Sequence, residues 1–280
     1  MITILDGKIA REEKISVLKK RIADLTFKPK LTIIQIGDKA ESNTYVKLKK
    51  AFGESIGAEV EMIKFDEKIS ADHLIEKIKN LNEDKSVNGI IVQLPIPKNL
   101  ELDEVLQTID PKKDVDGLTI SYLKKLWNGE TDCLLPATAK GIISLLDFYQ
   151  IPIDGKNVVI INHSALIGKP LSLLVLARGG TPTICHIKTK NLSEITKKAD
   201  IIVSATGNPK MINENFVSAG QVIIDVGFGL DKDGKISGDV DFESVKNIVS
   251  AISPVPGGAG PMTVVSLFEN LLDAVYGKQK

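Results

Sequence analysis

Hydrophobic and polar positions along the first half of the chain follow two alternating periods. Short runs of aliphatic and β-branched residues, typical of buried strands, occur at 31–37, 58–65 and 89–94. Segments with the spacing of amphipathic helices separate them, at 42–57 and 71–84. Strand and helix alternating in this way are typical of a parallel sheet covered by helices. The first half is therefore expected to form an open α/β unit.

The second half repeats this alternation with its own strands and helices. Strands are expected at 158–162, 181–187, 199–207 and 220–227, and helices at 168–178 and 191–198. This order predicts a Rossmann-like, doubly wound parallel sheet. The predicted fold class is thus α/β, with two open α/β domains.

The connections set the expected domain boundaries. A polar loop at 110–117 and a helix at 138–150 join the two halves, and a rigid loop rich in proline and glycine occupies 254–262. The apolar stripe of the final helix, 263–277, predicts that this helix returns to the first domain, although packing on the second domain stays open. The expected domains are 1–138 plus 257–280, and 139–256.

Charge and cysteine content narrow the class of partner. The 280 residues carry 36 basic and 36 acidic side chains, so no overall field favours nucleic acid or an anionic membrane. Cys133 and Cys185 lie far apart and no histidines cluster, which predicts neither a disulfide framework nor a metal site. No apolar run has the length of a signal peptide or a membrane span. These features predict a protein of the reducing cytoplasm.

Candidate chemistry in the first half lies on one helix and at one strand end. Tyr45 and Lys49 are four residues apart on a predicted helix and so share a face. Gln93 ends a predicted strand, at the sheet edge where open α/β folds bind ligands. Asp114 and Asp116 follow in the loop KKDVDG. Each of these also has a structural interpretation: a solvated helix face, a strand cap, or turn formers that bond to nearby backbone.

In the second half, the stretch VIINHSALIGKP predicts a strand that runs through a polar turn into a helix. Ser164 and backbone N–H groups near Gly168 can cradle a phosphate at the helix start, although the turn lacks G-x-G-x-x-G. The next strand ends in CHIKTK, with no carboxylate for a ribose 2'-hydroxyl, so a 2'-phosphate would be tolerated. The lysines of this stretch, Lys188 and Lys190, can equally be ordinary solvated charges of a loop.

Taken together, several ordered motifs resemble those of the bifunctional methylenetetrahydrofolate dehydrogenase/cyclohydrolase family. They are SNTYVKLK, GIIVQLPIP, PKKDVDG, CHIKTKNL, VIIDVG, GDVDF and PVPGGAGPMTV, and they span nearly the whole chain. The resemblance implies two domains across a cleft, folate on the first, NADP on the second, and a homodimer. It also implies oxidation of 5,10-methylenetetrahydrofolate to the methenyl form, followed by hydrolysis to 10-formyltetrahydrofolate.

The resemblance also implies roles for individual positions. Lys49 corresponds to the catalytic lysine, Gln93 to its partner, Tyr45 to the residue that orients the folate, and Asp116 to the carboxylate that holds the pterin. Further substrate contacts are implied at Pro256, Gly257 and Gly258. The implied cofactor contacts are Asn162, His163, Ser164, Ile167, Gly168, Lys188, Thr206 and Gly207.

The nucleotide turn departs from the family pattern. Where the family has G-R-S-x-x-V-G-x-P, this chain has His163 in place of the arginine that meets the 2'-phosphate. Ile187 replaces a usual serine in C-H-S-[KR]-T. A milder change turns the usual P-C-T-P into Pro136-Ala137-Thr138-Ala139, and Ala259 is the one difference in the PVPGGAGPMTV motif. A neutral imidazole cannot make the forked contact of a guanidinium. NADP is therefore expected through Lys188 and His163, with weak discrimination, so that NAD is possible.

Three alternatives remain open at this stage. A shikimate-type or amino-acid dehydrogenase also has open α/β halves, but it does not explain QLPIP or PGGAGPMT. A relative that kept the cyclohydrolase and lost the dehydrogenase fits the altered turn. A non-enzymatic folate- or nucleotide-binding protein fits it too, but the residues implied in catalysis are intact.

Overall fold

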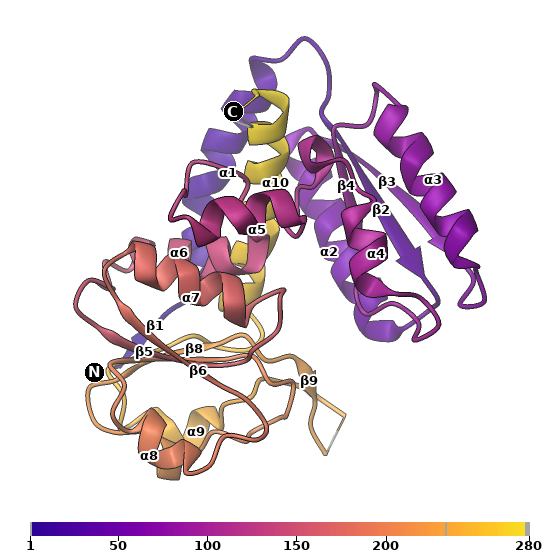
Figure 1. The fold of residues 1–280 in the computed structure, drawn as a ribbon. Helices are drawn as coiled ribbons and strands as arrows, with labels where there is room; N and C mark the ends of the chain where they lie inside the picture. Colours follow the sequence, from indigo (N-terminus) through magenta and orange to yellow (C-terminus); the bar gives the residue numbers. More distant parts are fainter. Residues whose placement is uncertain (1, 233, 278–280) are drawn as a thin grey trace. The chain divides into compact units, whose positions relative to one another are not determined.

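The computed structural model describes residues 2–232 and 234–277, which divide between two compact units. The three-stranded unit contains Lys14–Ala137 and the chain from Val264 onward. The six-stranded unit contains the residues up to Glu13 and Thr138–Thr263. Figure 1 shows both as α/β arrangements of helices around a sheet.

The three-stranded unit is built on a parallel sheet whose strand order is β3-β2-β4. Its strands are β2 (Lys30–Ile36), β3 (Glu59–Phe65) and β4 (Gly89–Val92). Its helices are α2 (Ala40–Ile56), α3 (Ala71–Glu83), α4 (Leu102–Gln107), η1 (Pro111–Lys113), α5 (Ile120–Trp127) and most of α1 (Gly7–Ala23) and α10 (Ala259–Val275). Figure 1 shows α3 and α4 on the side of the sheet opposite α2.

The core of this unit explains why the last helix returns to it. Side chains of α1, α2 and α10 pack with β2 in one cluster, which includes Leu18, Phe52, Phe268 and Leu271. The rings of Phe52 and Phe268 lie 5.4 Å apart between centroids. Since Phe268 and Leu271 are 1% and 0% exposed, α10 supplies apolar area that this small sheet needs for a closed core.

The six-stranded unit has a parallel sheet of order β1-β11-β8-β7-β5-β6. Its strands are β1 (Thr3–Ile4), β5 (Asn157–Ile161), β6 (Thr181–Cys185), β7 (Ile201–Ser204), β8 (Val222–Asp225) and β11 (Ala251–Ile252), with a separate β9 (Gly229–Leu230) and β10 (Ile236–Ser237) pair. Its helices are α6 (Ala137–Phe148), α7 (Gly168–Ala177), α8 (Leu192–Thr196), η2 (Glu214–Phe216) and α9 (Phe242–Val245).

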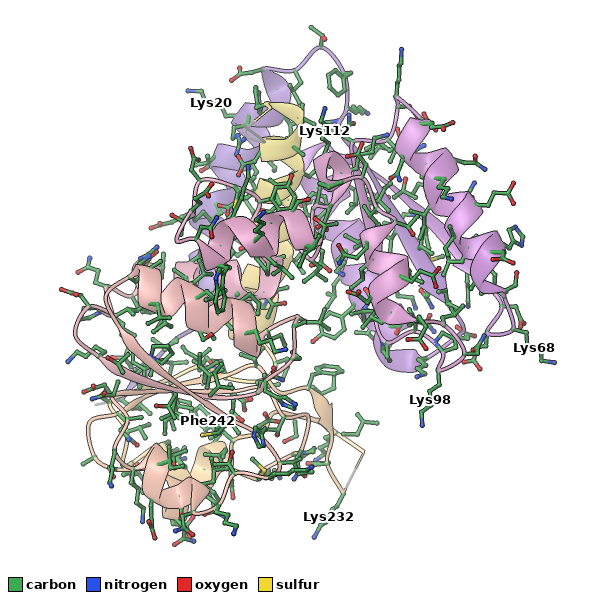
Figure 2. All side chains as sticks on the ribbon, in the orientation of Figure 1. Lys20, Lys68, Lys98, Lys112, Lys232 and Phe242 are labelled. Atoms are coloured by element: carbon green, nitrogen blue, oxygen red, sulfur yellow. The ribbon has the colours of Figure 1, made fainter. Side chains whose placement is uncertain are left out.

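Helices cover both faces of this sheet, as doubly wound folds require. Figure 1 shows α6 and α7 on one face and α8 and α9 on the other. Phe242, labelled in Figure 2, lies on the α8 and α9 face and packs against a cluster that includes Val159, Ile202 and Ile223. All residues of β7, and all of β5 except Asn157, are buried because helices lie above and below these strands.

The observed boundaries differ from the expected ones near both ends of the chain. Strand β1 pairs with β11, so the N-terminal segment lies in the six-stranded unit and not with 14–138. The proline- and glycine-rich loop stays in that unit as well, up to Thr263. The return of the final helix is confirmed. Within the described residues, no helix combines the length and apolarity needed to cross a membrane.

Candidate functional site

The strand order of the three-stranded unit creates a switch point between β2 and β4. The chain leaves β2 for β3 on one side and returns with β4 on the other, so the connections from these strands diverge at their carboxyl ends. Gln93 directly follows β4 and is held there because its backbone N–H donates to the Ile34 carbonyl at 2.8 Å. A polar side chain at this position lies where open α/β sheets bind ligands.

Lys49 reaches the same strand end from α2. Its Nζ donates a hydrogen bond to Gln93 Oε1 at 3.0 Å, and Gln93 Nε2 donates to the Leu94 carbonyl at 2.9 Å. The second bond orients the amide so that its oxygen faces the lysine. Tyr45 lies one helical turn before Lys49 and is half-buried. The structure thus brings together the expected pair Lys49 and Gln93, with Tyr45 on the same helix.

The two aspartates of KKDVDG have different surroundings. Asp114 is 1% exposed, and its carboxylate accepts from the backbone N–H groups of Gly117 at 2.9 Å and Thr119 at 2.7 Å. Burial raises the pKa of Asp114 to about 6. Asp116 is half-buried, and its carboxylate accepts no hydrogen bond from the residues that the structure describes. Asp114 is therefore a structural turn former, whereas Asp116 is available to a ligand.

Lys49 and Asp116 influence each other's titration. Burial lowers the pKa of the Lys49 ammonium, and the negative charge of Asp116 opposes that shift. Burial likewise raises the pKa of Asp116, opposed by the charge of Lys49. A lysine with a lowered pKa supplies more neutral amine near neutral pH, which is the form that accepts a proton.

The remaining substrate contacts implied by the resemblance belong to the six-stranded unit. Pro256, Gly257 and Gly258 follow a cis Val255–Pro256 bond in the loop before α10, and a second cis bond joins Leu94 to Pro95. The Gly7 N–H donates to the Gly257 carbonyl at 2.8 Å. A Cβ on Gly258 would lie 2.6 Å from the Pro254 carbonyl oxygen, so this tight loop requires glycine there.

The expected nucleotide turn lies at a second switch point, between β5 and β7. Strand β5 pairs with β6 on one side and with β7 on the other. Asn162 connects the loops that follow β5 and β7, because its Nδ2 donates to the Ala205 carbonyl at 2.7 Å. Its Oδ1 accepts from Ser164 N at 2.8 Å, Ser164 Oγ at 2.7 Å and Gly168 N at 3.1 Å.

This bonding changes the expected picture of the turn. The backbone N–H groups of Ser164 and Gly168 already donate to Asn162, and that of Ile167 donates to Ser164 Oγ at 3.2 Å. A Cβ on Gly168 would lie 1.9 Å from the Asn162 carbonyl oxygen, so only glycine allows this closure. The turn is therefore shaped internally by Asn162.

The loop after β7 is organised by a buried carboxylate that the sequence did not reveal. Asp239, 0% exposed, accepts from Ser204 Oγ at 2.7 Å, Thr206 N at 2.6 Å and Asn208 N at 3.0 Å. These bonds position the expected cofactor residues Thr206 and Gly207. Asp239 belongs to GDVDF, and this motif was the only sequence signal that pointed to it.

Beyond β6, the loop that was expected to meet a 2'-phosphate is exposed. Lys188 and Ile187 both point away from the core, and Ile187 is 98% exposed. His163 and His186 lie side by side at this end of the sheet. His186 was not among the expected cofactor residues, although the motif CHIKTK contains it.

Comparison with known proteins places these two sites in a family context. The bifunctional protein FolD of Acholeplasma laidlawii is 47% identical over 277 residues, covering 99% of each chain. The crystal structure of the bifunctional FolD enzyme from Campylobacter jejuni matches with a TM-score of 0.95 and 38% identity over 99% of each chain. The Trypanosoma brucei enzyme, solved with NADP and an inhibitor, matches at 0.93 with 28% identity, over 99% of this chain and 98% of that one.

Two family models match successive parts of the chain. Residues 5–116 match the catalytic domain of tetrahydrofolate dehydrogenase/cyclohydrolase, and residues 136–279 match its NAD(P)-binding domain. The expected fold class, enzyme class and nicotinamide dinucleotide cofactor are confirmed at this level. With relatives this similar over the full length, the chain belongs to the tetrahydrofolate dehydrogenase/cyclohydrolase family.

Proposed function

We propose that this protein oxidises 5,10-methylenetetrahydrofolate with NADP and hydrolyses the resulting methenyl cation to 10-formyltetrahydrofolate. The observation that carries the hydrolytic half is the Lys49–Gln93 hydrogen bond beside Asp116. The redox half is supported by two loops joined through Asn162 at a switch point of the six-stranded sheet. Dinucleotides bind at such points in doubly wound folds.

Asp116 is the proposed anchor for the pterin. Its carboxylate has no hydrogen-bond donor among the described residues, so it can accept from the ring N–H and amino groups of the substrate. Such charge-assisted bonds are stronger than neutral ones. Tyr45, one turn from Lys49 on α2, would orient the folate from the same helix face.

Lys49 is the proposed catalytic residue of the hydrolysis. Water adds to the methenyl carbon, and the C–N5 bond breaks with its electron pair passing to N5. Of the two protons that the water loses, one goes to N5 and one is released. The neutral amine of Lys49 can carry a proton between these positions, because burial lowers its pKa. Gln93 Oε1 holds the amine in place.

Two loops of the six-stranded unit support a dinucleotide site. Asn162 joins the loops after β5 and β7, and Asp239 fixes the loop that carries Thr206 and Gly207. When bound, the nicotinamide supplies the hydride acceptor. The proposed contacts of the protein with the whole dinucleotide are Asn162, His163, Ser164, Ile167, Gly168, Lys188, Thr206 and Gly207.

A coupled assay tests this function. Purified protein with 5,10-methylenetetrahydrofolate should reduce NADP and then convert the methenyl product. Lys49→Met should abolish hydrolysis while folate binding survives, because the amine is lost but Asp116 is kept. Lys47→Met on the same helix is the matched control, since Lys47 is exposed. Unchanged hydrolysis in Lys49→Met would refute the role of Lys49.

A relative with cyclohydrolase activity alone is the second candidate. It is favoured by one observation: the amides of Ser164 and Gly168 are bonded inside the turn and do not point freely toward a phosphate. In the same assay this candidate predicts methenyl hydrolysis with no reduction of NADP or NAD. Reduction of either dinucleotide rules it out.

The homodimer and the cytoplasmic location implied by the family resemblance are also part of the proposal. Exposed apolar side chains on the edge strand β6 and on α7, Ile184 and Leu176, support an association surface on the six-stranded unit. Light scattering of the purified protein measures the oligomeric state. A monomer at micromolar concentration would contradict the dimer.

A further inference from the structure

Two of the three histidines of the chain meet at the carboxyl ends of adjacent strands. His186 directly follows Cys185, the last residue of β6, and His163 is the second residue after β5. Their ring centroids are 5.2 Å apart with an interplanar angle of 58°. Both side chains are exposed to solvent. The pair therefore presents two imidazoles side by side on the open edge of the sheet.

The hydrogen bonds distinguish the two rings. Lys188 N donates to His186 Nδ1 at 3.1 Å, and His186 N donates to Thr189 Oγ1 at 2.9 Å. Because Nδ1 of His186 is an acceptor, its neutral ring carries hydrogen on Nε2 and can donate from there. Among the described residues, none forms a hydrogen bond with either ring nitrogen of His163. His163 is thus the ring that can gain a proton without breaking a bond.

The segments that carry the pair contain mostly positive charges. On the segments that follow β5 and β6, the cations nearest the strand ends are Lys169, Lys188 and Lys190. From 157 to 198, the only acidic residue is Glu194, on α8. A positive charge on either imidazole ring would be repelled by these lysines unless an anion binds close to the rings and the lysines. Protonation of the pair should therefore accompany anion binding, and repulsion between adjacent rings limits it to one proton.

We infer that His163 and His186 form a proton-coupled binding site for the 2'-phosphate of NADP. Neutral His186 donates from Nε2, and His163 takes up a proton as the phosphate binds. The inference rests on the proposed function, which puts the dinucleotide at the switch point between β5 and β7. In such folds the side chain that meets the ribose follows the next strand along the chain, which is β6 here. It makes cofactor choice depend on pH, because histidine changes charge between about pH 5 and 8.

The inference predicts how the ratio of NADP affinity to NAD affinity changes with pH. Uptake of one proton makes the preference for NADP over NAD fall as pH rises, by up to about tenfold per unit. We expect a fall of at least about tenfold between pH 6.5 and 8.5. A free phosphate monoester has its second pKa near 6, so its own titration adds little in this range. NAD lacks the phosphate and serves as the reference in every measurement.

The test is the pH dependence of the Kd for NADP and for NAD in the full chain and its variants. In His163→Arg the charge is permanent, so the ratio should lose most of its slope and NADP should bind more tightly at pH 8.5. His186→Asn removes the second ring and should weaken NADP at all pH values while keeping the slope. Calorimetry in two buffers of different ionisation enthalpy should show proton uptake with NADP and none with NAD.

The outcomes separate this inference from the proposed function. A flat ratio in the native protein, with both dinucleotides bound, overturns the proton-coupled site and leaves the enzyme intact. A slope that persists unchanged in His163→Arg also overturns it, since a group other than His163 would then be titrating. If neither dinucleotide binds while hydrolysis persists, the proposed redox function fails, and this inference fails with it.

Discussion

Lys49 and Gln93 come from different elements, and the lysine Nζ donates to the glutamine Oε1 at 3.0 Å. The glutamine amide is itself anchored, because its Nε2 donates to the Leu94 carbonyl. The lysine is therefore held by a neutral acceptor, which orients the amine without adding a negative charge. Burial is then free to lower the pKa of Lys49.

Replacing this neutral partner with a charged one should change the pH profile of the hydrolysis. In Gln93→Glu the new carboxylate stabilises the Lys49 ammonium, so the acidic limb of kcat should move up by about one pH unit or more. Gln93→Leu removes the partner without adding charge and should not move the limb upward. The pH dependence of methenyl hydrolysis measures both. Equal displacement in the two variants would argue against neutral Lys49 as the base.

The two aspartates of the loop before α5 should give different defects. Asp116→Asn should raise the KM for the folate substrate about tenfold or more, the equivalent of about 1.4 kcal/mol, and leave the Tm unchanged. Asp114→Asn replaces one accepting oxygen with an amide donor that faces a backbone N–H, so it should lower stability by about 1–3 kcal/mol. Thermal unfolding and steady-state kinetics separate these effects. A shared defect would mean that Asp116 also has a structural role.

Asn162→Ala should damage dinucleotide use selectively. The substitution removes the acceptor for Ser164 N, Ser164 Oγ and Gly168 N, and also the bond to the Ala205 carbonyl. We expect the KM for NADP to rise by at least about tenfold, since losing the hydrogen bonds that shape the turn costs about 1–3 kcal/mol of free energy. Methenyl hydrolysis, assayed without dinucleotide, is the internal control. Equal loss of both activities would show a general folding defect.

Asp225 should make stability depend on pH in an unusual direction. Burial raises its pKa from 3.8 to about 7, so the folded protein binds this proton more tightly than the unfolded chain. The stabilisation is complete below the unfolded pKa and is lost as pH rises through about 7. Its slope between those limits approaches about 1.4 kcal/mol per pH unit.

Asp225→Asn isolates this effect because asparagine does not titrate. The native carboxylate accepts from the backbone N–H groups of Gly227, Asp239 and Val240. The stability advantage of the native protein over the variant should therefore be larger at pH 5 than at pH 8. Thermal unfolding at both values measures it. A constant difference would show that Asp225 does not change protonation on unfolding.

Periodicity in the sequence predicted most of the architecture, but its errors have specific causes. The central strands were correctly placed because buried β-branched runs between turn signals have few other uses. Strand β1, Thr3–Ile4, spans two residues, and such a strand has no detectable period. Its place beside β11 depends on a partner about 250 residues away, so the N-terminus was assigned to the other domain.

At the candidate sites too, the sequence identified the residues and the tertiary structure decided which of their groups are free to bind a ligand. The motifs name Lys49, Gln93 and Asp116, but it is the family resemblance that distinguishes Asp116 from Asp114, because both residues are equally good turn formers by type and spacing. Only the fold shows that the backbone N–H groups of Gly117 and Thr119 donate to the two oxygens of the Asp114 carboxylate. The phosphate cradle at Ser164 and Gly168 was likewise expected without the side chain of Asn162, which uses those amides.

The sequence by itself determined the α/β class, the family and the residue types at both sites, because these depend on local periodicity and on ordered motifs. Tertiary structure decided which donors and acceptors remain available to ligands, and which side chains meet. His163 and His186 are 23 positions apart in the chain. They become neighbours because β5 and β6 pair in parallel, so both strands end at one edge of the sheet. Such pairing depends on strand order and register, which no short stretch of sequence contains.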